Sequence, residues 1–504
     1  MESKIKWYIL GGFTVGILLI LILLFGTNLN HRFMMGDNST GNMNGMGNMH
    51  GNGGNGMMRH GANIDLATSS EPPKPLPIPP ELKPDRETEG AVYYTVRAEQ
   101  GETQFFANGK RTPTLGYNGN LLGPMIKLPK GKTVYIDTVN RLAEPTTFHW
   151  HGLKIPSKED GGPHQPVKQG EQRRVRLDIE QEAATLWFHP HPMGSTAKQV
   201  YQGLAGLLYV TEEGSEIDLP HEYGVDDIPI IVQDRLFERD GTLNYDNSMN
   251  ADGTVGDTLI ANGAINTEFD VERSLMRVRL VNGSNARNFE FSLSGGETFT
   301  QIASDGGLLE EPVSLDRVAL SPGERAEILI DFSKNEVGDE IELQANGIPV
   351  NTFVIKGLEK SAADLEGLKE KSSLNRKSSE VDRRLTLFGM GNMVTIDGKR
   401  FDPDRIDIEV KRGVTEVWEI YNEKDMMGGM THPFHIHGVQ FRILERDGKV
   451  PSANEKGWKD TVAVTPGERV KIAIEFNEEG TFMYHCHNLE HEENGMMGQL
   501  KVTP

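Results

Sequence analysis

The sequence predicts an all-β protein whose body contains three β-sandwich domains. Its 504 residues exceed what one core usually organises, since domains of soluble proteins contain about 150 residues. The chain contains 56 glycines and 26 prolines among many stretches rich in Val, Thr and Ile, which is typical of short strands joined by turns. An internal repeat at a domain-sized spacing sets the number of domains at three.

The repeat is a Gly-Glu turn followed by a strand of alternating character. Its copies lie about 150 residues apart, at residues 169–179, 322–332 and 466–476. Each copy follows another predicted strand, which begins near Gly131, Ser274 or Gly413. Three copies of one β-sandwich unit explain the pattern, with domains at residues 91–214, 215–358 and 385–504. The charged residues 359–384 are predicted to be a connector, and a short surface helix on the second domain explains them equally well.

The first 32 residues predict a membrane anchor with a cytoplasmic tip. Residues 7–25 are uncharged and long enough to cross about 30 Å of hydrocarbon as a transmembrane helix. Lys4 and Lys6 precede them, which places the N-terminus in the cytoplasm and the body on the extracytoplasmic face. A cleaved signal peptide is the alternative, but no small-x-small cleavage motif follows Phe25.

Residues 33–90 are predicted to form a linker, rich first in Met and Gly and then in Pro. Residues 31–61 contain almost nothing that could form a core, so they should be disordered. The prolines of residues 71–84 favour a stiff, extended spacer. Seven of the 20 methionines lie in residues 34–58.

The charge of the chain argues against nucleic-acid binding, and its cysteine content excludes an intrachain disulfide. The 52 Lys and Arg face 73 Asp and Glu, and the net charge of −21 opposes binding to nucleic acid. Cys486 is the only cysteine, so no disulfide can form within the chain.

Histidine spacing predicts a metal site. The 15 histidines predict about half of one His-x-His pair by chance, yet the chain contains four. The pairs are His149/His151, His189/His191, His435/His437 and His485/His487. Side chains two apart on a strand share a face, so each pair can direct two imidazoles to one metal cluster.

The last of these pairs predicts a second kind of site. Cys486 lies between its two histidines, with its side chain expected on the opposite face of the strand. His432, His491 and Met496 complete a trigonal set with a weak thioether, which copper uses and zinc does not. Met497 competes with Met496, and a core position also explains Met496, but its ten-residue offset from Cys486 favours Met496 as the ligand.

These motifs and their order resemble the multicopper oxidases over most of residues 91–504. Further segments, among them DGGP, GLAGLL, GDTLIANGAI and GWKDTV, are similar to bacterial cuprous oxidases of copper-efflux systems and to bacterial laccases. The resemblance implies cupredoxin-like domains and an oxidoreductase that couples one-electron oxidation of a substrate to four-electron reduction of O2 to water. It also implies four copper ions, one of type 1, one of type 2 and two of type 3.

The resemblance implies ligands for each copper. The type 1 copper would be bound by His432, Cys486 and His491, with Met496 axial. The type 2 copper would be bound by His149 and His435. The type 3 coppers would be bound by His151, His189 and His487, and by His191, His437 and His485. The cluster then lies between the first and third domains, and the second domain acts mainly as a spacer and packing partner.

The resemblance also implies residues that carry electrons and protons. Cys486, His485 and His487 would connect the type 1 copper to the cluster. Asp160 and Glu492 occupy the positions that supply protons for O2 reduction. A plain surface position, or a hydrogen bond that orients a ligand, is the alternative for both acids.

The reducing substrate is predicted to be Cu(I), as in copper detoxification. Soft thioethers bind Cu(I), and the segment before His432 is similar to the substrate site of cuprous oxidases through Asp425, Met426, Met427 and Met430. It differs because GGM follows DMM and because no methionine-rich insertion precedes the third domain. We hypothesise that residues 34–58 gather Cu(I) instead. A linker with methionine as filler is the alternative.

A laccase-like oxidase of phenols or aromatic amines would share every copper ligand and is the alternative function. A copper store or a structural protein of the cell envelope with this fold should lack some cluster ligands, and none is missing. We expect O2 and either Cu(I) or a small aromatic reductant as partners of a monomeric catalytic body.

Overall fold

The computed structural model of the protein describes residues 64–212, 218–245, 252–361, 363, 365, 380–426 and 428–504. The predicted membrane anchor and the methionine-rich residues 34–58 lie outside the described residues. No helix in the described part of the chain is long and apolar enough to span a membrane.

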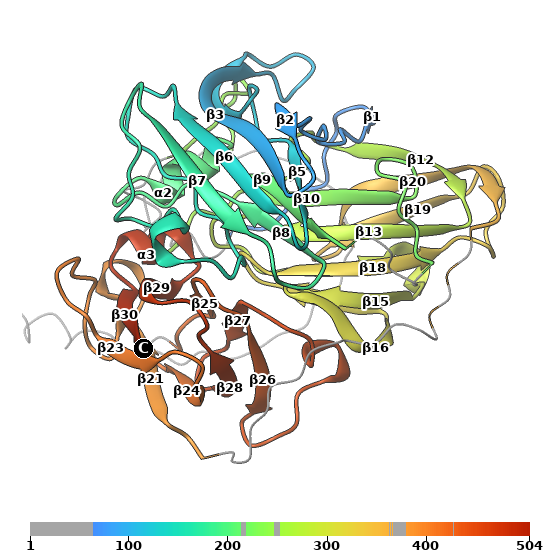
Figure 1. The fold of residues 1–504 in the computed structure, drawn as a ribbon. Helices are drawn as coiled ribbons and strands as arrows, with labels where there is room; N and C mark the ends of the chain where they lie inside the picture. The colour runs from blue at the N-terminus through green and yellow to red at the C-terminus, as the bar shows by residue number, and fades with distance from the viewer. Residues whose placement is uncertain are drawn as a thin grey trace, which may run out of the picture. The chain divides into compact units, whose positions relative to one another are not determined.

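The first β-sandwich packs a five-stranded sheet on a three-stranded one (Figure 1). The larger sheet has the order β2-β3-β6-β7, with β4 paired to β3: β2 (Arg86–Glu87), β3 (Ala91–Thr103), β6 (Thr133–Asn140), β7 (Gln172–Asp178) and β4 (Thr112–Tyr117). The smaller has the order β5 (Met125–Pro129), β9 (Gly206–Thr211), β8 (Ala184–Phe188). Val134 and Ile136 of β6 are fully buried between the sheets and alternate with more exposed neighbours, as predicted.

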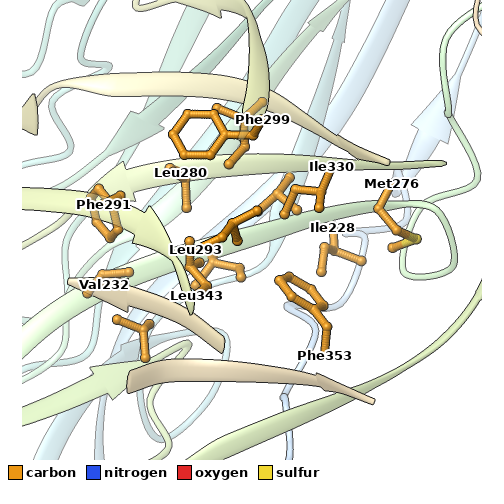
Figure 2. Packing of buried hydrophobic residues seen from close by; sticks show 14 of the residues in the cluster. Ile228, Val232, Met276, Leu280, Phe291, Leu293, Phe299, Ile330, Leu343 and Phe353 are labelled. Carbon is orange, nitrogen blue, oxygen red and sulfur yellow. The ribbon is translucent and has the colours of Figure 1, made fainter. Parts of the chain in front are cut away.

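The second β-sandwich contains two six-stranded sheets. One has the order β11 (Thr258–Ala261), β10 (Asp227–Arg235), β13 (Leu275–Asn282), β18 (Arg325–Asp331), β15 (Phe299–Ser304), β16 (Gly307–Leu315). The other has the order β1 (Lys74–Pro75), β12 (Thr267–Arg273), β20 (Ile348–Glu359), β19 (Glu340–Ala345), β14 (Phe289–Leu293), β17 (Arg317–Leu320). Figure 2 shows side chains from both sheets in the shared core, among them Ile228, Leu280, Ile330, Phe291, Leu343 and Phe353.

The third β-sandwich contains two five-stranded sheets. One has the order β22 (Thr395–Ile396), β21 (Arg383–Phe388), β24 (Thr415–Glu423), β28 (Arg469–Glu475), β26 (Phe441–Arg446). The other has the order β23 (Ile408–Lys411), β30 (Met497–Thr503), β29 (Gly480–Cys486), β25 (His432–Ile436), β27 (Thr461–Val464). Cys486 and Met496 belong to the core between these sheets, together with Trp418 and Phe434.

The repeat found in the sequence is a repeat of structure. Its copies are β7, β18 and β28, and each pairs antiparallel with the strand that precedes it in the pattern, β6, β13 or β24. In every copy the turn glycine has a positive φ, a conformation that favours glycine. Its N–H donates to the backbone carbonyl of a buried asparagine near the end of the preceding strand. The pairs are Gly170 to Asn140 at 2.8 Å, Gly323 to Asn282 at 3.0 Å and Gly467 to Asn422 at 2.7 Å.

The asparagine side chains explain why this turn recurs. Each Nδ2 donates to two backbone carbonyls of its own sandwich, for example Asn282 to the carbonyls of Arg287 and Leu320, both at 2.8 Å. A buried amide satisfied in this way ties the turn to loops that are distant in sequence. The asparagines were missed as structural residues, although each ends a predicted strand.

The proline-rich segment does not stand free as the spacer that the sequence predicts. Lys74 and Pro75 pair with β12, and Arg86 and Glu87 pair with β3, at the edges of two sheets. Edge positions tolerate proline because they need no continuous ladder of N–H donors. Within residues 64–90 the predicted linker therefore packs on the body.

Short helical segments connect the strands. In the part of the chain that the structure describes, the helices are α2 (Thr196–Tyr201) and α3 (Leu489–Glu493), and the 3₁₀ turns are η2 (Ser157–Glu159), η3 (Ser294–Gly296), η4 (Gly391–Met393) and η5 (Ala453–Glu455). Helix α3 directly follows the last His-x-His segment and lies beside α2 (Figure 1), where the Ala197 N–H donates to Glu493 Oε1 at 2.8 Å. The first and third sandwiches therefore meet next to the predicted metal ligands.

Candidate metal centre

The four His-x-His segments lie in two pairs, one in the first sandwich and one in the third. His149 and His189 exchange backbone hydrogen bonds at 2.9 and 3.2 Å. His435 in β25 is opposite His485 in β29. Segments that are distant in sequence thus bring two His-x-His motifs side by side in each sandwich.

All eight imidazoles of these segments meet between the two sandwiches, and none is more than 1 % exposed. The rings of His149 and His437 stack with centroids 3.8 Å apart, and so do those of His151 and His435. Ring nitrogens come closer still, with His485 Nε2 lying 3.0 Å from His437 Nε2 and 3.2 Å from His191 Nε2. His487 completes the group, with its ring centroid 5.0 Å from that of His151.

One nitrogen of most rings is anchored on the outside of this cluster. Nδ1 of four rings donates to a backbone carbonyl: His149 to Asp160 at 3.0 Å, His189 to Pro190 at 2.9 Å, His435 to Asp460 at 2.8 Å and His485 to Cys486 at 3.1 Å. A neutral imidazole with its proton on Nδ1 has its lone pair on Nε2. This arrangement aims bare nitrogens at the centre of the cluster.

His151 has the opposite orientation. Its Nε2 lies 2.9 Å from Asp460 Oδ1, and its Nδ1 lies 3.3 Å from His189 Nε2. His151 therefore offers Nδ1 to the cluster.

The neutral imidazoles of the cluster can bind a positive ion. Burial lowers the pKa of all eight imidazoles, to about 3 for His189 and about 4 for His485, so they stay neutral and keep a lone pair for metal. His149 Nε2, His435 Nε2 and both nitrogens of His487 are buried without a hydrogen-bond acceptor or donor. Such atoms are costly unless something else binds them, so the donor set fits metal ions.

The second predicted site lies on the other face of β29. Cys486 Sγ is 3.5 Å from His432 Nδ1 and 3.9 Å from His491 Nδ1, and all three residues are buried. The Cys486 N–H donates to the Met496 carbonyl at 3.0 Å, which holds Met496 next to the thiol in the core. Burial raises the pKa of the Cys486 thiol. A bound metal ion would hold this sulfur as a thiolate, and two imidazoles and one thiolate with a weak thioether are the ligand set of a blue-copper site.

The two predicted proton donors touch the imidazoles of the cluster. Asp160 Oδ2 lies 2.7 Å from His437 Nδ1, and burial raises the pKa of Asp160 to about 8. Glu492 lies between two rings, 3.4 Å from His191 Nδ1 and 3.2 Å from His485 Nδ1, and burial raises its pKa well above the usual range. Neither acid has the surface position that the sequence left open.

The predicted substrate residues are only partly brought together. Asp425 accepts the Gly429 N–H at 2.9 Å, and its charge lies close enough to His432 to oppose the fall of that imidazole's pKa, which burial lowers to about 4. Met426 is fully exposed and Met430 is half-buried. Met427 lies outside the described residues.

Two contacts of the site were missed in the sequence. Asp460 holds His151 and His435, and the only signal for it was its place in the GWKDTV segment. The Gly389 carbonyl accepts a hydrogen bond from His432, and no motif marks it.

Comparison with known proteins decides which family builds such a site. Sequence models described as multicopper oxidase match residues 99–215, 226–339 and 373–504. The chain belongs to the multicopper oxidases. It is therefore an oxidoreductase with copper cofactors, and the expected all-β, cupredoxin-like fold is confirmed.

Three relatives show how far the similarity extends. A multicopper oxidase of Staphylococcus aureus is 47% identical over 86% of this chain and 94% of its own. The crystal structure of a laccase from Pediococcus acidilactici has a TM-score of 0.85 and 42% identity, covering 88% of this chain and 96% of its own. A Campylobacter jejuni multicopper oxidase, described as a metallo-oxidase, has a TM-score of 0.74 and 28% identity, covering 88% and 98%.

Replacing Cys486 with serine separates the two kinds of site. We expect the blue absorbance to disappear, because a serine oxygen does not supply a soft thiolate, while the copper bound by the eight imidazoles is retained. Oxygen consumption with any reductant should fall to background. Absorption spectra and copper content measure the two effects, and loss of all copper would contradict separate sites.

Proposed function

We propose that this multicopper oxidase oxidises Cu(I) to Cu(II) and reduces O2 to water. Four Cu(I) ions, one O2 and four protons give four Cu(II) ions and two waters, which balances charge and atoms. The observation that carries the proposal is the Asp425 carboxylate close to His432, in a segment that also supplies the exposed Met426 and the half-buried Met430. Thioethers suit the soft Cu(I) ion, and a carboxylate supplies opposite charge. The description of the Campylobacter jejuni relative as a metallo-oxidase supports a metal substrate.

The ligand sets implied by the resemblance are proposed for four resident copper ions. His432, Cys486, His491 and Met496 would hold the type 1 ion, and the eight imidazoles of the cluster would hold the type 2 and type 3 ions. When bound, copper would supply one-electron transfer at the first site and reduction of O2 at the cluster. Cys486 is joined through the chain to His485 and His487, so a covalent path connects the two sites.

Protons would reach the cluster through the two buried acids. Asp160 and Glu492 each lie against cluster imidazoles, from opposite sandwiches. Glu492 also lines a cavity of about 340 Å³, together with His191, Met193 and Arg400. A carboxyl that lines this cavity and contacts the imidazoles can take a proton from water and present it next to them.

The N-terminal residues would anchor the body outside the cell and gather substrate. Residues 7–25 have the length and apolarity of a membrane span, and residues 34–58 contain seven methionines. Such a tail would raise the local concentration of Cu(I) near the body.

A laccase-like activity on phenols is the second candidate, favoured by the name of the Pediococcus acidilactici relative. We expect Asp425→Ala to lower kcat/KM for Cu(I) about tenfold, equivalent to about 1.4 kcal/mol, and to leave phenol oxidation unchanged. Oxygen uptake measures both rates. The control is Asp270→Ala, which removes an exposed carboxylate in the second sandwich. In the parent, phenol turnover is measured with added copper chelated, and Cu(I) turnover is measured without the chelator. A phenol rate above the Cu(I) rate would overturn the Cu(I) assignment.

Asp160→Asn and Glu492→Gln keep the shape of each acid and remove its proton. Each should lower kcat for O2 reduction about 100-fold while copper content and blue absorbance stay at parent levels. Glu159→Gln, next to Asp160 and paired only loosely with Arg173 at 3.9 Å, is the matched control. Loss of copper in place of loss of rate would assign these acids to ligand orientation.

Replacing the seven methionines of residues 34–58 with serine keeps the length of the tail and removes its thioethers. The rate at limiting Cu(I) should fall severalfold, because the local Cu(I) supply is lost, with an unchanged rate at saturating Cu(I). The variant should stay in the membrane fraction. An unchanged rate at low copper contradicts the tail's role, and recovery in the soluble fraction contradicts the anchor.

A further inference from the structure

Arg325, at the start of β18 in the second sandwich, reaches the metal cluster although it touches no copper ligand directly. Its side chain is fully buried and forms a bidentate pair with Asp460 of the third sandwich. Nη1 donates to Oδ1 and Nη2 to Oδ2, both at 2.7 Å. This fork geometry fixes the plane of the Asp460 carboxylate.

Asp460 in turn holds two imidazoles of the cluster. Its Oδ1 lies 2.9 Å from His151 Nε2, and its backbone carbonyl accepts from His435 Nδ1 at 2.8 Å. The His151 contact is the one that reverses this ring and leaves Nδ1 for the cluster. One aspartate therefore orients a ring of the first sandwich and a ring of the third.

The guanidinium is held on every side, so it cannot follow a displaced carboxylate. Nε donates to the Thr185 carbonyl at 3.1 Å, Nη1 to the Gly323 carbonyl at 2.9 Å and Nη2 to the Asp305 carbonyl at 2.9 Å. The other buried charges around it are also paired. Lys459 lies 3.0 Å from Asp305 and 3.1 Å from Glu324. A buried ion pair of this kind is better suited to fixing geometry than to adding stability.

The other two copies of the repeat show that the turn itself does not require this arginine. The residue after Gly-Glu is Gln172 in the first sandwich, where it is exposed. In the third sandwich it is Arg469, which is half-exposed, lies 3.1 Å from Glu419 and stacks on Tyr421 with its guanidinium carbon 3.9 Å from the ring centroid. Only the copy in the second sandwich directs a guanidinium at a residue that holds cluster imidazoles.

We propose that Arg325 is a positioning residue for the copper cluster, acting through Asp460 on His151 and His435. The second sandwich is then more than the spacer and packing partner that the sequence predicts, because it supplies the cation that sets the orientation of two imidazoles. The inference rests on the proposed ligand sets and is independent of whether the substrate is Cu(I) or a phenol.

The test uses the copper-loaded, full-length Arg325→Gln variant. We expect the electron paramagnetic resonance spectrum of the type 2 copper to change and cluster copper to be lost to a chelator about 10- to 100-fold more readily, the usual effect of removing a residue that orients a ligand. The blue absorbance should persist, because the Cys486 site lies on the other face of β29 and reports that the third sandwich is folded. Arg469→Gln, the matched change in the third copy, should alter neither signal.

A double-variant cycle shows whether the effect runs through Asp460. Arg325→Gln combined with Asp460→Asn should lose copper no faster than Asp460→Asn alone. Additive losses, or a parent-like type 2 spectrum and copper retention in Arg325→Gln, would overturn the proposal. If Arg325→Gln does not fold, Arg325→Lys decides: it keeps the charge without the fork, so parent-like signals overturn the proposal and an altered type 2 spectrum with blue colour supports it.

Discussion

Most buried imidazoles of the cluster hold one ring nitrogen against a carbonyl or a carboxylate and leave the other for metal. This constraint governs the centre of the molecule, since eight neutral rings meet in a buried site where an unpaired polar atom is costly. Four of the rings solve it with backbone carbonyls, which no side-chain substitution removes. Carboxylates hold the rings of His151, His191 and His437, and Asp160, Glu492 and Asp460 each contact two rings. The acids that could move protons are thus part of the same frame that holds the ligands.

That frame needs three sandwiches of one construction. In each sandwich the Gly-Glu turn is bonded to a buried asparagine near the end of a central strand. The residue after the turn therefore has the same place in all three sandwiches. The side chain at this place has a different role in each sandwich. In the third sandwich the residue after the turn faces the surface, whereas in the second it reaches Asp460 at the boundary with the cluster. The three turns share a backbone conformation, and the residue that follows them differs in the sandwich where it contacts the metal site.

The sequence was informative wherever local geometry decides the outcome. A two-residue period on a strand puts His485 and His487 on one face and Cys486 on the other, and this follows without knowledge of the fold. The contacts that orient those rings escape such reasoning because their partners are far along the chain: Asp160 is 277 residues from His437, and Asp460 is 309 from His151. The proline-rich segment was misjudged for a related reason, since its composition does not tell a free spacer from a strand added to a sheet edge.

The proposed substrate site lies outside the buried imidazole cluster, in the segment before His432. His432 is only 1 % exposed, and the Gly389 carbonyl and the Asp425 carboxylate lie near its ring. A cation bound by a carboxylate and thioethers of that segment is held at a fixed distance from the imidazole, whereas a phenol needs an apolar pocket to be held equally close. The exposed Met426 and the carboxylate of Asp425 near His432 are the features that support the proposed cation substrate. Under the proposed function, selectivity between a cation and a phenol belongs to the short segment before His432.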